Sequence, residues 1–101
     1  MSVIRDAMIA DRRLALLRLL VEAGGQCGES SLEKALKALG FGTMLDRDQV
    51  RSDLKHLKET DCVELEYFEG RIMVAAITKR GVSAQAGNIE IPGVSAPSMG
   101  R

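Results

Sequence analysis

Hydrophobic side chains recur at helical spacing in the first part of the chain. Leu14, Leu17 and Val21 follow the i, i+3, i+7 rule, which predicts a helix over about Asp11–Ala23. Leu16 and Leu20 widen this stripe, so we expect the helix to be buried on more than one side. Residues 2–10 either extend this helix or form a separate turn.

A second helix is predicted to begin at Ser30 or Ser31, after a polar loop over residues 26–29. Ser30 and Glu33 have the spacing of a capping box. Gly40 and Gly42 end the helix, and Phe41 between them is expected to fold back onto the core. The inward face is formed by apolar residues at helical spacing: Leu32, Ala35, Leu36 and Leu39.

A third helix is predicted over Asp46–Glu59, with Asp46 or Asp48 as its N-cap. Val50, Leu54 and Leu57 form its buried stripe. A basic stripe runs beside the buried one, made of Arg47, Arg51, Lys55 and Lys58.

After Asp61 the period changes from 3.6 to 2, which is typical of a half-buried strand over residues 63–68. Glu69-Gly70 is predicted to form a two-residue hairpin turn, and residues 71–77 are predicted to form the returning strand. Thr78 caps a short last helix that ends near Ala86. The sequence therefore predicts an α+β domain over residues 1–87, with three helices, a two-stranded antiparallel hairpin and a short C-terminal helix.

The C-terminal segment, residues 88–101, has a different composition from the domain. It contains both prolines and few large apolar side chains. We expect a flexible tail that begins with a short strand-like piece over residues 89–91.

Charge and length limit the classes of function. The chain has 101 residues, with 14 basic and 14 acidic side chains, so any contact with nucleic acid must come from local placement of charge. The longest apolar stretch near the start is too short to span a bilayer, and no signal peptide is evident. We expect a cytoplasmic protein without membrane association.

Catalytic and metal-binding patterns are missing from the sequence. Cys27 and Cys62 lie 35 positions apart, a separation that allows a disulfide. We expect two reduced thiols instead, because an intracellular environment keeps cysteines reduced. His56, the sole histidine, matches no zinc spacing. Without a nucleophile elbow or a phosphate-binding loop, the sequence predicts no enzyme activity, no metal and no cofactor.

The order of the elements resembles a winged helix-turn-helix, most clearly over the segment DQVRSDLKHLKETDCVELE. A closer resemblance, to small winged-helix proteins of Mu-like phages and prophages, rests on several blocks: DRRL with LALLRLLVEAGG, ESSLEKALKALGFG, DQVRSDLKHL, and the tail GNIEIPGVSAP. The first three blocks are shared loosely with ArsR-like regulators. The resemblance implies a phage protein that acts in the cytoplasm of a bacterial host.

In a winged helix, the third helix would lie in the major groove of double-stranded DNA. Its readers would be Arg47, Gln49, Arg51, Ser52 and Lys55, with Arg12 and Arg13 on phosphates. In the alternative interpretation the basic residues are solvated i, i+4 partners of Asp48, Asp53 and Glu59.

The predicted wing favours a different partner. Residues 61–71 carry four acidic side chains against one basic side chain, Arg71, and a phosphate backbone should repel them. We therefore hold two hypotheses: a DNA-binding accessory factor or transcriptional regulator, and a protein-interaction adaptor in phage assembly or packaging that uses the acidic hairpin or the first helix.

A homodimer is also expected. Apolar residues at the N-terminus offer a surface for a second copy, unless they complete the core: Val3, Ile4, Met8 and Ile9.

Overall fold

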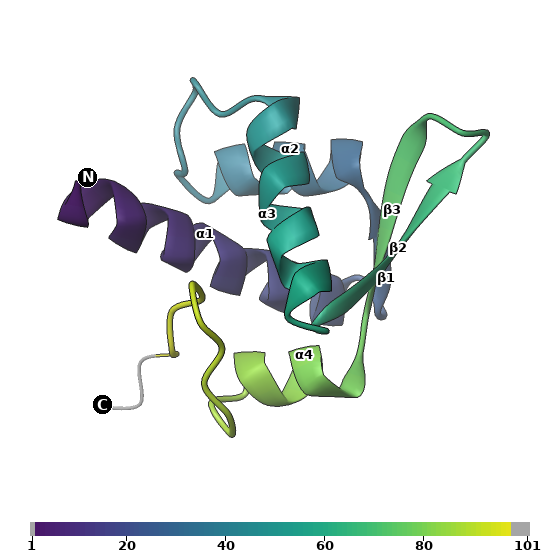
Figure 1. Cartoon of the computed structure of the whole chain (residues 1–101). Helices are drawn as coiled ribbons and strands as arrows, with labels where there is room; N and C mark the ends of the chain where they lie inside the picture. The colour runs from purple at the N-terminus through teal and green to yellow at the C-terminus, as the bar shows by residue number, and fades with distance from the viewer. Residues whose placement is uncertain (1, 98–101) are drawn as a thin grey trace.

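The computed structural model describes residues 2–97 as four helices and a three-stranded antiparallel sheet (Figure 1). The elements follow the chain in the order α1 (Val3–Glu22), β1 (Gln26–Gly28), α2 (Glu29–Ala38), α3 (Arg47–Glu59), β2 (Val63–Phe68), β3 (Ile72–Ile77) and α4 (Lys79–Gln85). The predicted α+β class is confirmed.

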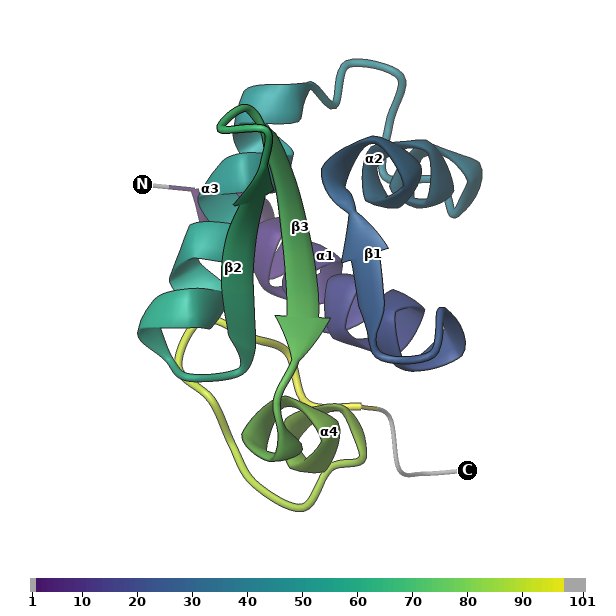
Figure 2. The ribbon, with the colours of Figure 1, turned by 90° about the vertical axis from the view of Figure 1, so that its right-hand side faces the viewer.

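The sheet has three strands rather than the predicted two. Its order is β1-β3-β2, and residues 26–28, which we predicted as a loop, pair with β3 from Gln26 opposite Ala76 to Gly28 opposite Val74. A three-residue strand has too few positions to show alternation, and it becomes a strand only because β3 offers a free edge. α1 and α3 lie behind the sheet in Figure 2.

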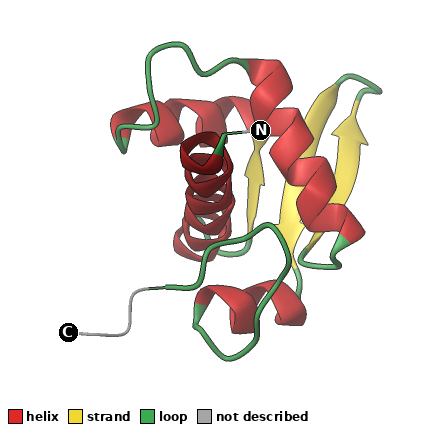
Figure 3. Cartoon of the chain, turned by 60° about the vertical axis from the view of Figure 1, so that its left-hand side comes forward, coloured by secondary structure: helices red, strands yellow, loops and turns green. Residues whose placement is uncertain are grey.

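The core is aliphatic and lies between the helices and one face of the sheet. Leu16, Leu17 and Leu20 of α1 are fully buried. α2, α3, β2 and β3 each add at least one large buried side chain: Leu32, Leu36, Val50, Leu54, Leu57, Val63 and Met73. Figure 3 shows α1 end-on in the middle of the fold, among the other helices.

α1 is one continuous helix, which decides between the two possibilities for residues 2–10. The Ser2 hydroxyl caps it by accepting a hydrogen bond from the Arg5 backbone N–H (3.2 Å). Its first buried residue is Leu14, so the N-terminal half extends beyond the core.

α2 begins earlier than predicted, and the Ser30–Glu33 capping box is wrong. Gly28 is the N-cap and makes no side-chain cap hydrogen bond. Glu29, now the first helical residue, is 1% exposed, and its carboxylate accepts bonds from other elements. Leu39, predicted to face inward, lies after the helix and is 59% exposed, whereas Phe41 packs against the core as predicted.

Of the two caps predicted for α3, Asp46 is the N-cap and Asp48 is not, and the predicted Thr78 cap of α4 is confirmed. The Asp46 carboxylate accepts from the Gln49 N–H (2.9 Å) and the Gln49 side chain accepts from the Asp46 N–H (3.0 Å), which is a capping box. Thr78 caps α4 through the Gly81 N–H (3.1 Å). Glu69 and Gly70 both have positive φ in the hairpin turn, as a turn between twisted strands requires.

Residues 88–97 follow α4 back across the fold. They form no strand, so the predicted strand-like piece over residues 89–91 is wrong. Ile91 instead inserts into the core at 5% exposure, and the Ser95 N–H donates to the Ala10 carbonyl of α1 (3.1 Å). This part of the predicted flexible tail therefore has a defined place; residues 98–101 lie outside the described residues.

Candidate functional site

The outward face of α3 carries a polar hollow of about 540 Å³. Every side chain that lines it is polar, and the lining combines both charges: Arg13, Asp48, Arg51, Ser52, Lys55, His56 and Glu59. The hollow contains four of the seven residues predicted to contact DNA. A surface of this kind can make hydrogen bonds but offers no apolar anchor.

Arg51 is held by a buried carboxylate. Its guanidinium donates to both carboxylate oxygens of Glu29 (2.5 and 2.8 Å) and to the Arg71 carbonyl in the hairpin (2.7 Å). Glu29 also accepts the Met73 backbone N–H (2.8 Å). The hydrogen bonds from Arg51 lower the pKa of Glu29, against the opposing effect of burial, and Glu29 raises the pKa of Arg51. This network ties α2, α3 and β3 together.

Arg47 is also paired within the molecule. Its Nε donates to Glu33 on α2 (2.6 Å), and its Nη1 lies 3.9 Å from Glu29. Hydrogen bonds from Arg47 and then from Lys37 lower the pKa of Glu33. Two of the predicted base readers therefore join α2 to α3.

Arg12 and Arg13 converge on Asp53, whose side chain is 1% exposed. Arg12 donates to it through Nε and Nη2, and Arg13 donates through Nε (3.1 Å). The interpretation of Asp53 as an outward i, i+4 partner is therefore wrong, because α3 turns this carboxylate toward α1. A fully buried charge must be paired in this way.

The segment after α4 covers one flank of this site. The Arg13 Nη1 donates to the Gly93 carbonyl (3.2 Å), and the His56 Nε2 donates to the Pro92 carbonyl (2.7 Å). Gly93 has a φ of +77°, which strains any residue with a Cβ, and a Cβ at this position would also lie 2.7 Å from the His56 Nε2 and displace that side chain. The Ser95 hydroxyl donates to Asp11 (2.5 Å).

The structure thus places five of the seven predicted residues on α3 and the other two, Arg12 and Arg13, on α1. It gives most of the seven internal partners. All four arginines are ion-paired, and Gln49 is engaged in the α3 cap. Ser52 and Lys55 remain exposed, and within residues 2–97 Lys55 makes no ion pair.

Sequence reasoning missed the two carboxylates that organise the site. Glu29 lies in a stretch without any periodic pattern, and Asp53 lies on a helix rich in charge. Asp53 does have one signal: it is three residues after Val50 and one before Leu54, so it lies on the buried side of α3. Glu29 has no comparable signal.

Among residues 2–97, no three His, Cys, Asp or Glu side chains gather as metal ligands. Cys62 is buried and Cys27 is half-buried, both as free thiols. No helix in this part of the chain is long and apolar enough to cross a membrane.

Two known proteins are similar to this chain. One is the uncharacterized protein gp26 of Escherichia phage Mu, which is 34% identical over 94 residues; the match covers 93% of this chain and 95% of the phage protein. The chain belongs to the gp26 family of phage Mu. The other is an uncharacterized protein of Haemophilus influenzae, which is 36% identical over 76 residues; the match covers 75% of this chain and 72% of that protein. No protein-family model and no solved structure matches the chain. Association with phages is therefore supported for this gp26 relative.

Proposed function

We propose that this gp26 relative is a winged-helix protein that binds double-stranded DNA through α3. The element order α1-β1-α2-α3-β2-β3 and the strand order β1-β3-β2 support the winged-helix assignment, in which α3 is the recognition helix and the β2–β3 hairpin is the wing. The observation that carries the proposal is the exposed and wholly polar outward face of α3.

In this proposal, Ser52 and Lys55 make the principal contacts. A serine hydroxyl can donate to or accept from base edges, and a lysine can contact guanine or a phosphate. Arg51 is one-third exposed and can contribute while it keeps its bond to Glu29. The internal ion pairs leave few cations free to contact phosphates, so DNA affinity should depend only weakly on salt. Each neutralised phosphate contributes about −0.9 to the slope of log K against log salt concentration, so we expect a slope of only about −2 to −3.

The acidic hairpin should stay off the DNA backbone. Glu64, Glu66 and Glu69 are all exposed, and phosphates would repel them. Contact is therefore proposed through α3 alone, in a transcriptional regulator or an accessory factor acting on phage DNA.

The test is fluorescence anisotropy with labelled random duplex DNA, titrated across salt. Lys55→Ala should weaken binding severalfold and reduce the slope by about one. Lys79→Ala is the matched control: Lys79 is exposed on α4 and has no ion pair within residues 2–97. Absence of binding at low salt in a folded sample, or equal losses in both variants, would refute the proposal.

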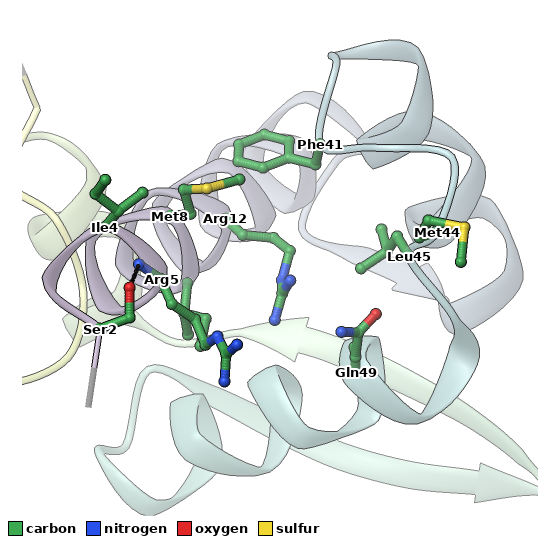
Figure 4. Close-up of a pocket in the computed structure, with 10 residues that line it drawn as sticks. Ser2, Ile4, Arg5, Met8, Arg12, Phe41, Met44, Leu45 and Gln49 are labelled. Atoms are coloured by element: carbon green, nitrogen blue, oxygen red, sulfur yellow. Dashed lines mark hydrogen bonds between the residues drawn. The ribbon is translucent and has the colours of Figure 1, made fainter.

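We also propose that the chain forms a homodimer through the N-terminal half of α1. Ile4 and Met8 are 74% and 53% exposed, and Met44 in the α2–α3 loop is 87% exposed. Together with Phe41 and Leu45 they line a groove of about 360 Å³ (Figure 4). Exposed apolar surface of this kind marks association sites.

Sedimentation of the wild type and of Met8→Glu tests the dimer. Met8→Glu should shift the equilibrium toward monomer, whereas Val82→Glu on α4, a similarly exposed apolar position at 42%, should not. A wild-type chain that is monomeric at high concentration would contradict the dimer.

A second candidate function is favoured by the sheet. On the face opposite the buried Met73 and Ala75, apolar side chains of β3 lie beside the exposed Glu64 and Glu66 of β2. This combination supports a protein-interaction adaptor in phage assembly or packaging.

A further inference from the structure

Among residues 2–97, no helix covers one face of the sheet. Met73 and Ala75 of β3 point into the core and are fully buried. Because strand side chains alternate, Ile72, Val74 and Ala76 point to the opposite face. Figure 2 views the sheet from this side, with α1 and α3 on the far side.

The uncovered face combines an apolar centre with an acidic edge. Ile72, Val74 and Ala76 lie along the central strand β3. The register places Glu64 opposite Ala76, Glu66 opposite Val74 and Phe68 opposite Ile72. The apolar side chains are thus flanked on one side by two exposed carboxylates, and Phe68, which is 63% exposed, closes the strip at the tip of the hairpin.

Positive charge is scarce on this surface. Among the described residues, β1 contributes only Gln26 and Gly28 to this face, and the nearest base along the hairpin is Arg71 in the turn. Glu64 and Glu66 make no ion pair among residues 2–97. The surface therefore carries unneutralised negative charge beside apolar area.

We propose that this face binds a basic, extended segment of another protein, in which lysine or arginine alternates with apolar residues. The apolar side chains of such a segment would project to one side of its backbone, over Val74 of β3 and toward Phe68 at the hairpin tip. Its cations would project to the other side and meet Glu64 and Glu66 of β2. A shallow hollow of about 460 Å³ provides space for its side chains, lined by Gln26, Leu65, Glu66, Tyr67, Phe68 and Val74. A nucleic acid is disfavoured by the charge, and a purely apolar partner would leave the carboxylates desolvated without a partner.

Binding of a basic segment specifies the partner in the adaptor role proposed above, and it does not depend on DNA binding by α3. Each proposal can fail without the other, because peptide binding is measured with peptides and hairpin variants, and DNA binding with duplex DNA and α3 variants.

The test uses the full chain and a labelled peptide in which lysine alternates with valine, compared with a matched peptide in which glutamate replaces lysine. Fluorescence anisotropy should detect the lysine peptide, more weakly at higher salt, and not the glutamate peptide. Backbone amide chemical shifts should change along β2 and β3 and not along α3.

Variants locate the interaction. The double variant Glu64→Lys/Glu66→Lys should lower the affinity for the lysine peptide about tenfold, because two exposed attractive charge pairs become repulsive. Asp6→Lys/Glu22→Lys on α1 makes the same change in net charge at exposed positions and should change affinity less than about twofold. Phe68→Ser should weaken binding without changing its salt dependence.

The proposal is overturned if the two peptides bind equally or if neither binds. It is also overturned if both double variants lose the same affinity for the lysine peptide, or if the amide chemical shifts that change belong to α3. Circular dichroism of each variant confirms that it is folded before binding is compared.

Discussion

Replacing Asp53 by asparagine tests whether Arg12 and Arg13 serve the fold rather than DNA. The substitution keeps the size of the side chain and removes its charge. In the wild type, the carboxylate accepts three hydrogen bonds from the two guanidiniums. An amide offers one acceptor oxygen, and its NH₂ group faces cationic donors with which it cannot bond.

The expected loss follows from burial. Removing one partner of a fully buried pair costs about 3–5 kcal/mol. The Arg12 and Arg13 side chains remain 13% and 17% exposed, so water can recover part of this energy, and we expect a loss of about 2–4 kcal/mol in the free energy of unfolding. For a domain of this size that lowers Tm by on the order of 10–20 °C.

Urea unfolding followed by circular dichroism gives the free energy directly. Asp48→Asn is the matched control: it makes the same change at an exposed position of the same helix, where a change within about 0.5 kcal/mol is expected. If Asp53→Asn is as stable as Asp48→Asn, the assignment of a structural role to the two arginines is refuted.

Three further predictions concern stability. The pKa of Glu29 is lowered in the folded state, so its carboxylate stabilises the protein at pH values above its ordinary pKa of 4.5, and this stabilisation is lost as the pH falls through the folded pKa. The free energy of unfolding of Glu29→Gln should therefore fall less steeply with acid than that of the wild type. Parallel losses of stability in the two proteins would contradict this. Gly81→Ala should destabilise by about 1–3 kcal/mol in thermal melts, since the new Cβ would contact the Cys62 carbonyl oxygen and lie 2.7 Å from the Ile77 Cγ1; unchanged Tm would show that the approach relaxes freely. Ile91→Ala should cost about 2–4 kcal/mol in urea unfolding because this side chain is buried, and a loss below 0.5 kcal/mol, the range of surface changes, would show that residues 88–97 add little to the core.

Local patterns predicted much of the fold. Periodicity located α3 and both strands of the hairpin, and side-chain chemistry identified the caps at Asp46 and Thr78. These features depend on residues a few positions apart, so they can be read without knowing what packs against them. The prediction of a helix-rich α+β domain rested on such signals.

The candidate site was predicted only in part. The exposure of Ser52 and Lys55 follows from the helical period of α3, which the sequence contains. The pairing of Arg51 with Glu29, across 22 residues, and of Arg12 with Asp53, across 41, does not follow from any local spacing. The basic stripe on α3 therefore suggested a larger positive surface than the folded protein presents.

The sequence by itself determined the helices, the hairpin, the caps and the neutral charge balance, because each is a property of composition or of neighbours along the chain. The tertiary structure alone decided that Gln26–Gly28 is a strand, that Glu29 and Asp53 are buried, and that Ile91 joins the core. The physical reason is the same in each case. A short strand needs the edge of another strand for its backbone hydrogen bonds, a buried carboxylate needs a cation, and an isoleucine outside any periodic pattern needs apolar side chains to pack against. Elements distant in the sequence supply each of them.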